Sequence, residues 1–316
     1  MIYVGVDLGG TNIKVAAVTP EGNILAEANR ATEAQRGAEA VCDDIVLAMH
    51  EAVQAAGYTA ADIAGLGVGC PGTINNETGF VQYSNNLHWR SFNMRGYLLA
   101  KTGLTAAMGN DANVAALGEV HAGSAKGAQS AVIITLGTGV GSGVVLDGKI
   151  LTGYTGAASE IGHMVIKDGG WRCTCGRLGC FESYASATGL IRLTKEGIEQ
   201  NPGSQMAKIA AERGVVDGRT SFDAMRLNDE AGAAVVAAYI HYLAVGIANI
   251  VNIFYPEIIS LSGGISKEGE TLLAPLREQV NQKVFGGMEG RCTRIEVCTL
   301  GHKAGVIGAA RLAQGE

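Results

Sequence analysis

Three cysteines and one histidine fall within a short segment of this chain, and together they could hold a metal ion. They are His163, Cys173, Cys175 and Cys180. A Cys-x-Cys pair does not close a disulfide easily, but its two thiolates can share one metal, and the four side chains make a tetrahedral Cys3His set. Glycines between them let the backbone turn sharply enough to bring them together. The segment therefore predicts a structural zinc site.

Two glutamates, Glu160 and Glu182, bracket these ligands. If the segment folds around a metal, both carboxylates would be placed to form hydrogen bonds with a neighbouring group. The alternative is that the cysteines are small buried apolar residues and the histidine an ordinary polar one. Their clustering between glycines favours zinc. We interpret the cysteines outside the segment as packing residues, namely Cys42, Cys70, Cys292 and Cys298.

Length and composition restrict the class of protein. A chain of 316 residues is long enough for two domains. Because no charged-then-apolar leader follows Met1, no apolar run looks long enough to cross a bilayer and the cysteine count is odd, we expect a cytoplasmic protein without a membrane partner. The formal net charge is -6 with no basic cluster, so no nucleic-acid partner is expected.

The elements that must position these groups follow a repeated strand, glycine turn, strand pattern. In the first half, three strands read as a meander and precede a helix and a buried strand. In the second half, two strands flank a glycine-rich turn, Asp147-Gly148 signals a hairpin, and a long helix, a strand and a closing helix follow. The predicted ranges are Ile2 to Asp7, Ile13 to Val18, Asn23 to Ala28, Ala38 to Ala56, Ile63 to Gly69, Ser130 to Leu136, Val144 to Leu146, Ala231 to Val251 and Ile258 to Leu261. The repetition predicts two related α/β domains.

Asp7 ends the first strand and is followed by Gly9, Gly10 and Thr11. The exposed backbone N–H groups of such a turn, helped by a threonine hydroxyl, can bind phosphate oxygens. A tight hairpin with Asp7 as a turn former would give the same pattern. Because glycine turns recur at 137–143 and 261–265, the three together favour phosphate binding. The P-loop sequence is absent, which excludes that class of enzyme.

Asn110 and Asp111 precede an alanine-rich helix pattern. A carboxylate there could accept the proton of a hydroxyl that attacks phosphorus, while the amide binds a neighbouring hydroxyl. An Asn-Asp pair is equally suited to cap the helix. The segment by itself does not choose between catalysis and capping.

Taken together, the cysteine segment, its upstream Glu-x-Gly-His, Asn110-Asp111 and the glycine turns closely resemble the ROK family of bacterial sugar kinases, most of all its glucokinases. The cysteine segment is specific to that family, whereas the turns are shared with actin, hexokinase and Hsp70. The resemblance implies an α/β fold of two ribonuclease-H-like domains around a central cleft, over residues 1–115 and 116–302, with the helix 303–316 packing back on the first. It also implies a homodimer or a dimer of dimers.

The resemblance further implies a role for each group. Asp111 is implied as the general base, and His163 as a ligand of zinc through one ring nitrogen and of the sugar through the other. The other implied sugar ligands are Gly72, Asn86, Asn110, Glu160 and Glu182. The implied phosphate and magnesium loops are Asp7, Gly9, Gly10, Thr11, Asn12, Lys14, Gly137, Thr138 and Gly139, with Gly263 and Gly264 against adenosine.

The implied reaction is ATP-dependent phosphorylation of glucose to glucose 6-phosphate, a step of glycolysis, with Mg²⁺ and structural Zn²⁺. N-acetylmannosamine or N-acetylglucosamine kinase is the alternative enzyme. A catalytically silent sugar sensor is the alternative outside enzymes, although the intact Asp7 and Asp111 argue against it. Because the chain begins at the first phosphate strand, a repressor with a preceding helix-turn-helix domain is not expected. Loss of zinc is expected to disorder the sugar ligands and to spare the nucleotide loops, which lie on other strands.

Overall fold

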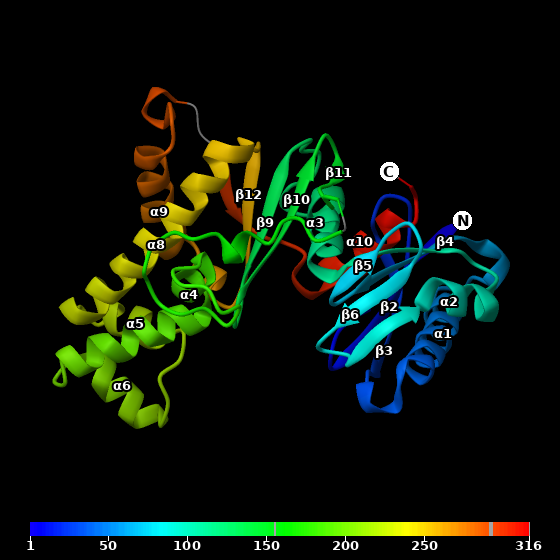
Figure 1. The fold of residues 1–316 in the computed structure, drawn as a ribbon, viewed down its shortest axis with the longest axis horizontal. Coiled ribbons are helices and arrows are strands. Elements are labelled where there is room, and N and C mark those ends of the chain that lie inside the picture. The colour runs from blue at the N-terminus through cyan, green and yellow to red at the C-terminus, as the bar shows by residue number, and fades with distance from the viewer. Residues whose placement is uncertain (155, 291–292, 316) are drawn as a thin grey trace. The chain divides into compact units, whose positions relative to one another are not determined.

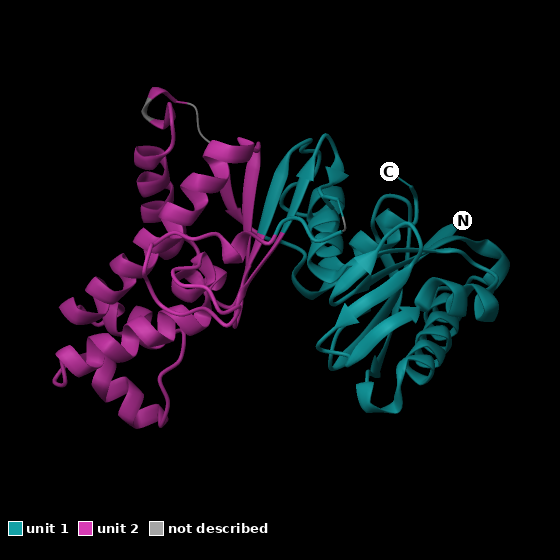
Figure 2. Cartoon of the chain, in the orientation of Figure 1, with its two compact units in different colours: residues 1–133, 143–159, 298–316 teal, residues 134–142, 160–297 magenta. Residues whose placement is uncertain are grey.

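The computed structural model of the chain describes residues 1–154, 156–290 and 293–315, and its contacts divide the chain into two compact units (Figures 1 and 2). Unit 1 comprises Met1–Ile133, Gly143–Ser159 and Cys298–Glu316, and unit 2 comprises Ile134–Ser142 and Glu160–Val297. The domain boundaries expected at residues 115 and 302 stay a prediction. Cys292, interpreted as a packing residue, lies outside the described residues.

The main sheet of unit 1 has the strand order β3-β2-β1-β4-β8. The first three strands pair antiparallel, as the predicted meander requires, and β4 and β8 continue the sheet in parallel. A smaller antiparallel sheet has the order β5-β6-β7. The strands are β1 (Ile2–Leu8), β2 (Asn12–Val18), β3 (Ile24–Ala31), β4 (Ile63–Cys70), β5 (Thr73–Asn75), β6 (Phe80–Ser84), β7 (Trp89–Asn93) and β8 (Ala106–Asn110).

Helices cover both faces of the main sheet at its centre, which explains why β1 and β4 are mostly buried, whereas the edge strand β3 is largely exposed. Val4 and Val15 pack with α1 in the larger core cluster, whereas Ala16 and Val18 pack with Val306 of α10 (Figure 1). The helices of unit 1 are α1 (Ala38–Ala55), α2 (Met94–Thr102), α3 (Asp111–Ala122) and α10 (Ala304–Leu312).

Glycines allow α10 to lie unusually close to the sheet. A Cβ atom on Gly5 would lie 1.9 Å from the carbonyl oxygen of Val306, and one on Gly67 would lie 1.8 Å from that of Ala309. Because real Cβ atoms do not approach so closely, only glycine fits at these two strand positions. The C-terminal helix therefore packs directly on β1 and β4, and the predicted residues Asp7 and Gly72 lie at or just after the ends of these strands.

A second five-stranded sheet has the order β11-β10-β9-β12-β13. Numbered by their order along the chain within each sheet, both five-stranded sheets follow the sequence 3-2-1-4-5. This repeat confirms the predicted pair of related α/β domains of the ribonuclease-H type. The strands are β9 (Ala131–Leu136), β10 (Val140–Leu146), β11 (Lys149–Ile150), β12 (Ile258–Gly263) and β13 (Arg294–Val297).

The hairpin predicted at Asp147-Gly148 joins β10 to β11, and both residues have positive φ, 51° and 73°, as a type I′ turn requires. The preceding glycine turn is shorter than predicted, because β10 begins at Val140 rather than Val144. Gly143 lies within this strand, at a position where a Cβ would lie 2.5 Å from the Cβ of Ala116 in α3. The glycine serves close packing and not a turn.

The helices of unit 2 surround α8, which contacts α4, α5, α7 and α9. Our expectation that no apolar run could cross a bilayer is wrong for α8, which is long and apolar enough, but 61% of its apolar window is buried inside the protein. We assign it as the core helix of this unit. The helices are α4 (Phe181–Ala185), α5 (Ala187–Gln200), α6 (Gln205–Arg213), α7 (Thr220–Arg226), α8 (Glu230–Phe254) and α9 (Glu270–Lys283).

Candidate functional site

Asp7 lies in β1 opposite Lys14 of β2, with its Oδ2 atom 3.7 Å from the lysine Nζ. Burial raises the pKa of Asp7, although the lysine acts in the opposite direction. The turn that follows is closed by backbone and not by this carboxylate, since the N–H of Gly9 donates to the carbonyl of Asn12 at 2.9 Å. Asp7 is therefore not the turn former of the hairpin alternative, and its carboxylate is available for another task.

The glycine turn after Asp7 leaves Gly10, Thr11 and Asn12 exposed. Its position is held by Thr32, a buried residue whose hydroxyl donates to the carbonyl of Gly9 at 2.7 Å. Asn86 lies beside the turn, because a Cβ on Gly10 would lie 3.3 Å from the Cβ of Asn86. The structure thus brings these predicted residues together. Sequence reasoning missed Thr32, for which no local signal exists.

Asn110 is the N-cap residue of α3. Its Oδ1 atom accepts hydrogen bonds from the N–H groups of Ala112 at 3.0 Å and Asn113 at 3.4 Å. Its Nδ2 group donates to the carbonyl of Gly72 at 3.1 Å. Gly72 has φ of +113°, and a Cβ there would lie 2.2 Å from the carbonyl oxygen of Tyr83, so this position requires glycine.

Asp111 is the first residue of α3, and one carboxylate oxygen accepts from the N–H of Ala112 at 2.9 Å. Burial raises the pKa of Asp111, and the carboxylate of Asp7 raises it further. Two carboxyl groups with raised pKa values in one region are typical of a site that handles protons or charge. Asn110 therefore caps the helix, and the role of Asp111 as a base stays a prediction.

In unit 2, the four predicted metal ligands form one cluster, with their ligand atoms all within 4.8 Å of one another. The Sγ atoms of Cys175 and Cys180 are 3.7 Å apart, and Sγ of Cys173 is 3.6 Å from Nδ1 of His163. Zn–S bonds of about 2.3 Å in a tetrahedron place two sulfur atoms about 3.8 Å apart, so the donor set fits zinc. Coordination through Nδ1 would leave Nε2 of the histidine for another partner.

The thiols of this cluster differ in acidity. The backbone N–H of Arg177 lowers the pKa of Cys175, whereas burial raises the pKa of Cys180 to about 12. A thiol binds metal as its thiolate, so metal binding would release the Cys180 proton.

Backbone contacts hold the cluster to its neighbours. The N–H of Phe181 donates to the carbonyl of Met164 at 2.8 Å, which ties the start of α4 to the end of the turn that carries His163. The hydroxyl of Tyr184 accepts from the N–H of Trp171 at 2.7 Å, and the two rings stack with centroids 4.5 Å apart. These contacts tether the cysteine segment to α4 without any metal.

The core helix α8 in turn positions α4. The hydroxyl of Tyr239 donates to the carbonyl of Ala185 at 2.7 Å. Gly246 makes room for the ring of Phe181, since a Cβ there would lie 2.2 Å from it. The short helix that carries Glu182 is therefore anchored at both ends.

Glu160 and Glu182 lie on different elements of this segment. Glu160 is exposed and precedes the 3-10 turn Ile161–His163. Glu182 lies in the first turn of α4, and its Oε2 atom accepts from the N–H of Val140 at 3.0 Å, directly after the second glycine turn. A carboxylate of the metal segment thus contacts the residue next to this turn. The expectation that loss of zinc spares the nucleotide loops stays a prediction.

The second glycine turn is held through its carbonyl groups. The N–H of Ala187 donates to the carbonyl of Gly137 at 2.8 Å, and the hydroxyl of Thr188 donates to that of Thr138 at 2.8 Å. Both donors belong to the first turn of α5, so these two carbonyls face that helix. The N–H of Gly137 donates to the carbonyl of Gly139 at 3.0 Å, so an anionic ligand of this loop would be met by its other N–H groups.

The third glycine turn packs against the strand that leads to the second. Gly263 has φ of +96°, and a Cβ there would lie 2.2 Å from the carbonyl oxygen of Leu136. The hydroxyl of Ser266 donates to the carbonyl of Gly263 at 2.8 Å. Gly264 follows and begins a 3-10 turn, Ile265–Glu268. The structure thus places Gly263 and Gly137 on neighbouring strand ends.

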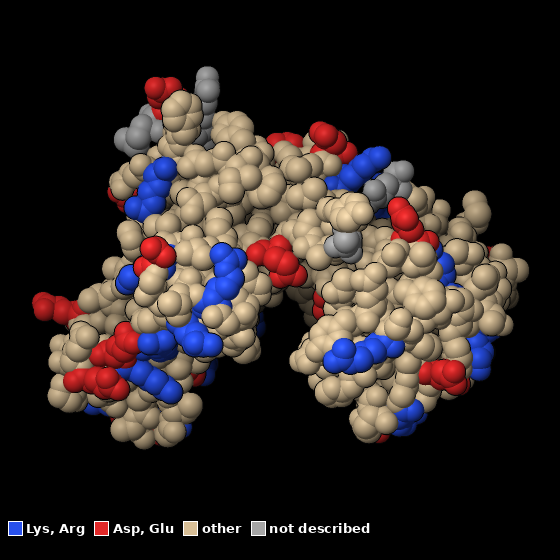
Figure 3. Space-filling model, in the orientation of Figure 1, with Lys and Arg blue, Asp and Glu red and all other residues tan. Residues whose placement is uncertain are grey.

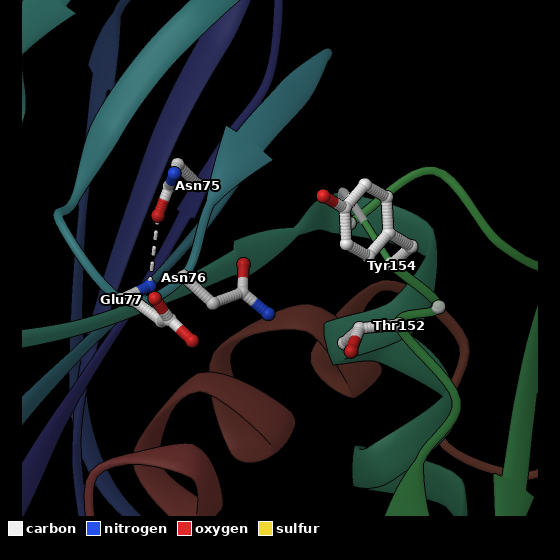
Figure 4. Close-up of a pocket in the computed structure, with 7 residues that line it drawn as sticks. Asn75, Asn76, Glu77, Thr152 and Tyr154 are labelled. Carbon is white, nitrogen blue, oxygen red and sulfur yellow. Dashed lines mark hydrogen bonds between the residues drawn. The ribbon is translucent and has the colours of Figure 1, made fainter.

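A separate cavity of unit 1 contains none of the predicted residues (Figure 4). Its volume is about 130 Å³, and the Asn76 side chain extends into it toward Thr152. Its lining residues are Asn75, Asn76, Glu77, Thr152, Gly153, Tyr154 and Gly156. On the face in Figure 3, Lys and Arg lie among Asp and Glu rather than in one patch. Arg213 and Arg226, for example, both pair with Asp223.

Comparison with known proteins identifies the family of this chain. The sequence model of the ROK family matches residues 3–316. The glucokinase of Halalkalibacterium halodurans is 40% identical over 315 residues, which cover 98% of this chain and 94% of the relative.

Two solved structures share the fold over nearly their whole length. A ROK family glucokinase from Streptomyces griseus, in complex with glucose and AMPPNP, is 32% identical with a TM-score of 0.77, and each chain is covered in full. The ROK hexokinase of Thermus thermophilus is 30% identical with a TM-score of 0.82, covering 99% of this chain and 98% of that one.

Proposed function

We propose that this chain, which belongs to the ROK family, transfers the terminal phosphoryl group of ATP to glucose. The observation that carries the proposal is the half-buried carboxylate of Asp111, whose helix is capped by its neighbour Asn110. The relatives support the choice of substrates, because the similar chain from Streptomyces griseus was solved with glucose and an ATP analogue.

Asp111 acts as the general base. Its carboxylate takes the proton of the sugar 6-hydroxyl while that oxygen attacks the terminal phosphorus of ATP. The bond from this phosphorus to the bridging oxygen breaks, and ADP leaves with the electron pair. Burial supports this role, because a carboxylate with a raised pKa is a stronger base than an ordinary aspartate.

The remaining groups bind and orient. Glu160, His163 and Glu182 bind sugar hydroxyls, with His163 using the ring nitrogen that the metal leaves free. Gly72, Asn86 and Asn110 complete the sugar ligands. The phosphate groups are bound by the turns Asp7, Gly9, Gly10, Thr11, Asn12, Lys14 and Gly137, Thr138, Gly139, and adenosine by Gly263 and Gly264.

Two metal ions belong to the proposal. Carboxylate and hydroxyl oxygens are the donors that Mg²⁺ prefers, so Asp7 and the exposed Thr11 suit it, and the bound ion supplies positive charge to the phosphates. The Cys3His cluster suits Zn²⁺, and four protein ligands leave no position for a reacting water. The zinc is therefore structural.

We also propose that the enzyme works in the cytoplasm as a homodimer or a dimer of dimers, and that its product enters glycolysis. A sensor without catalysis is disfavoured, because the chain retains both Asp7 and Asp111.

A sugar panel tests the proposal. ADP release is measured with saturating Mg·ATP and either glucose, N-acetylmannosamine or N-acetylglucosamine, and we expect the highest kcat/KM for glucose. A higher value for either N-acetylhexosamine would reassign the substrate. Glucose binding by calorimetry without ADP release would identify a sensor.

A further inference from the structure

The carboxylate of Glu182 has contacts in two directions within unit 2. Its Oε2 atom accepts from the N–H of Val140 at 3.0 Å, directly after the glycine turn Gly137–Gly139. Its Oε1 atom accepts from the hydroxyl of Thr174 at 3.3 Å, between two of the cysteine ligands. One side chain thus joins the metal segment to the turn that we assign to phosphate.

The glycine turn is packed closely around this carboxylate. A Cβ on Gly139 would lie 2.3 Å from Oε2 of Glu182. On the other side of Val140, a Cβ on Gly162 would lie 2.3 Å from the Val140 carbonyl oxygen. Val140 therefore lies between Glu182 and the 3-10 turn that carries His163. A shift of the carboxylate has to move the end of the glycine turn or lose the hydrogen bond.

On the metal side, two groups can donate to Oε1 of Glu182. Besides the hydroxyl of Thr174, Sγ of Cys173 lies 3.5 Å away and donates as a thiol. A hydroxyl is a stronger hydrogen-bond donor than a thiol. The hydroxyl of Thr174, which is also the nearer of the two groups, is therefore the main donor to Oε1.

We propose that Thr174 is a positioning residue that holds Glu182 so that sugar binding and nucleotide binding strengthen each other. The inference rests on the proposed function. A sugar bound to Glu182 fixes the carboxylate, which fixes Val140 and with it the glycine turn that receives phosphate. Coupling between two ligands is reciprocal, so a bound nucleotide favours the sugar by the same factor.

The main test compares Thr174→Val with Thr174→Ser. The dissociation constant of glucose is measured by calorimetry with and without AMPPNP and Mg²⁺, and the ratio of the two constants is the coupling factor. We expect Thr174→Val to lower this factor about fivefold, the equivalent of about 1 kcal/mol for one hydrogen bond. Thr174→Ser keeps the hydroxyl and should keep the factor. Thr174 is exposed, and the zinc content and Tm of each variant check that the segment stays folded.

Gly139→Ala tests the same link from the other side. The added Cβ displaces the Glu182 carboxylate from the glycine turn, so we expect weaker glucose binding even without nucleotide. A variant of a phosphate turn that changes sugar affinity by itself supports the link.

Three results would overturn the inference: a coupling factor of 1 in the unaltered protein, an unchanged factor in Thr174→Val, or a loss in Thr174→Ser equal to that in Thr174→Val. Failure of the proposed function looks different, because the unaltered protein would then lack binding of glucose, of AMPPNP or of both, and no coupling factor could be measured. In that case this inference falls with it.

Discussion

The proposed site residues of unit 1 and those of unit 2 are held by different kinds of structure. In unit 1, Asp7 lies in the central strand β1, and Asp111 begins the helix α3. In unit 2, His163 lies in the three-residue turn Ile161–His163, and Glu182 lies in the five-residue helix α4. Regular elements carry the first pair, and very short ones carry the second.

This difference indicates what each group of residues depends on. A strand inside a sheet and a packed helix are fixed by backbone hydrogen bonds and by burial. Helices of one turn are not stable alone, because nucleation costs more than a single turn returns. The segment of unit 2 therefore relies on cross-links: the Tyr184 hydroxyl on Trp171 and the Glu182 carboxylate on Val140, to which the metal proposed at the Cys3His cluster would add a third.

The largest expected effect comes from Asp111→Asn in unit 1. The change removes the base but keeps the shape, so we expect turnover to fall by about two to four orders of magnitude while glucose affinity is largely kept. Stopped assays of ADP release give kcat, and calorimetry gives the glucose affinity. Near-normal turnover would show that Asp111 is a structural residue of the helix start and not a base.

Loss of the metal should act mainly on unit 2. We expect one zinc per chain by elemental analysis, and Cys175→Ser should lose it and weaken glucose binding about 10- to 100-fold. AMPPNP binding should weaken less, because the carboxylate link reaches only one of the proposed nucleotide loops. Cys42→Ala is the matched control, since it removes a buried thiol outside the cluster.

Equal loss of glucose and AMPPNP binding in Cys175→Ser would mean that the metal supports the whole fold. Purified protein without stoichiometric zinc would contradict the metal site itself.

Glu119 tests whether hydrogen bonds inside unit 1 stabilise this unit independently of the metal. This buried carboxylate of α3 accepts from the N–H groups of Ser124 at 2.8 Å, Thr299 at 3.2 Å and Leu300 at 2.9 Å. Glu119→Gln replaces one acceptor oxygen by an N–H donor, so we expect the free energy of unfolding to fall by about 1–3 kcal/mol. Urea unfolding measures it, with the exposed Glu199→Gln as the control.

Zinc content should be unchanged in Glu119→Gln, because the metal ligands all lie in unit 2. If Glu119→Gln lost zinc as well as stability, the site residues of unit 1 and those of unit 2 would not be held independently.

The smallest effect concerns pH. Burial raises the pKa of Asp111, so the folded state favours the protonated form. The contribution of the protonated Asp111 to the free energy of unfolding is fully present below the pKa of the unfolded state, near 3.8. It is lost as pH rises through the higher pKa of the folded state. Asp111→Asn should therefore have a higher Tm than the unaltered protein at pH 7, and the difference should vanish as pH falls below 3.8. A lower Tm at pH 7 would show that the ionised carboxylate stabilises the fold.

Local signals in the sequence determined most of the elements and the metal ligands. Apolar alternation and turn residues placed the meander β1–β3, the helix α8 and the hairpin at Asp147-Gly148 close to their observed bounds. The spacing of Cys173, Cys175 and Cys180 predicted the cluster, because local turns bring together side chains that are a few residues apart. The start of β10 was missed, since a glycine required by packing reads like a glycine required by a turn.

Only the tertiary structure showed that the side chain of Asn110 caps α3, because capping depends on which side chain reaches the helix N–H groups. It also placed Thr32 on the turn at Gly9, 23 residues away, and joined Glu182 to Val140 across 42 residues. Turns, caps and periodicity act over a few residues and can be predicted from them. A contact between distant residues forms only when the packing of whole elements brings them together, and no short stretch of sequence carries that information.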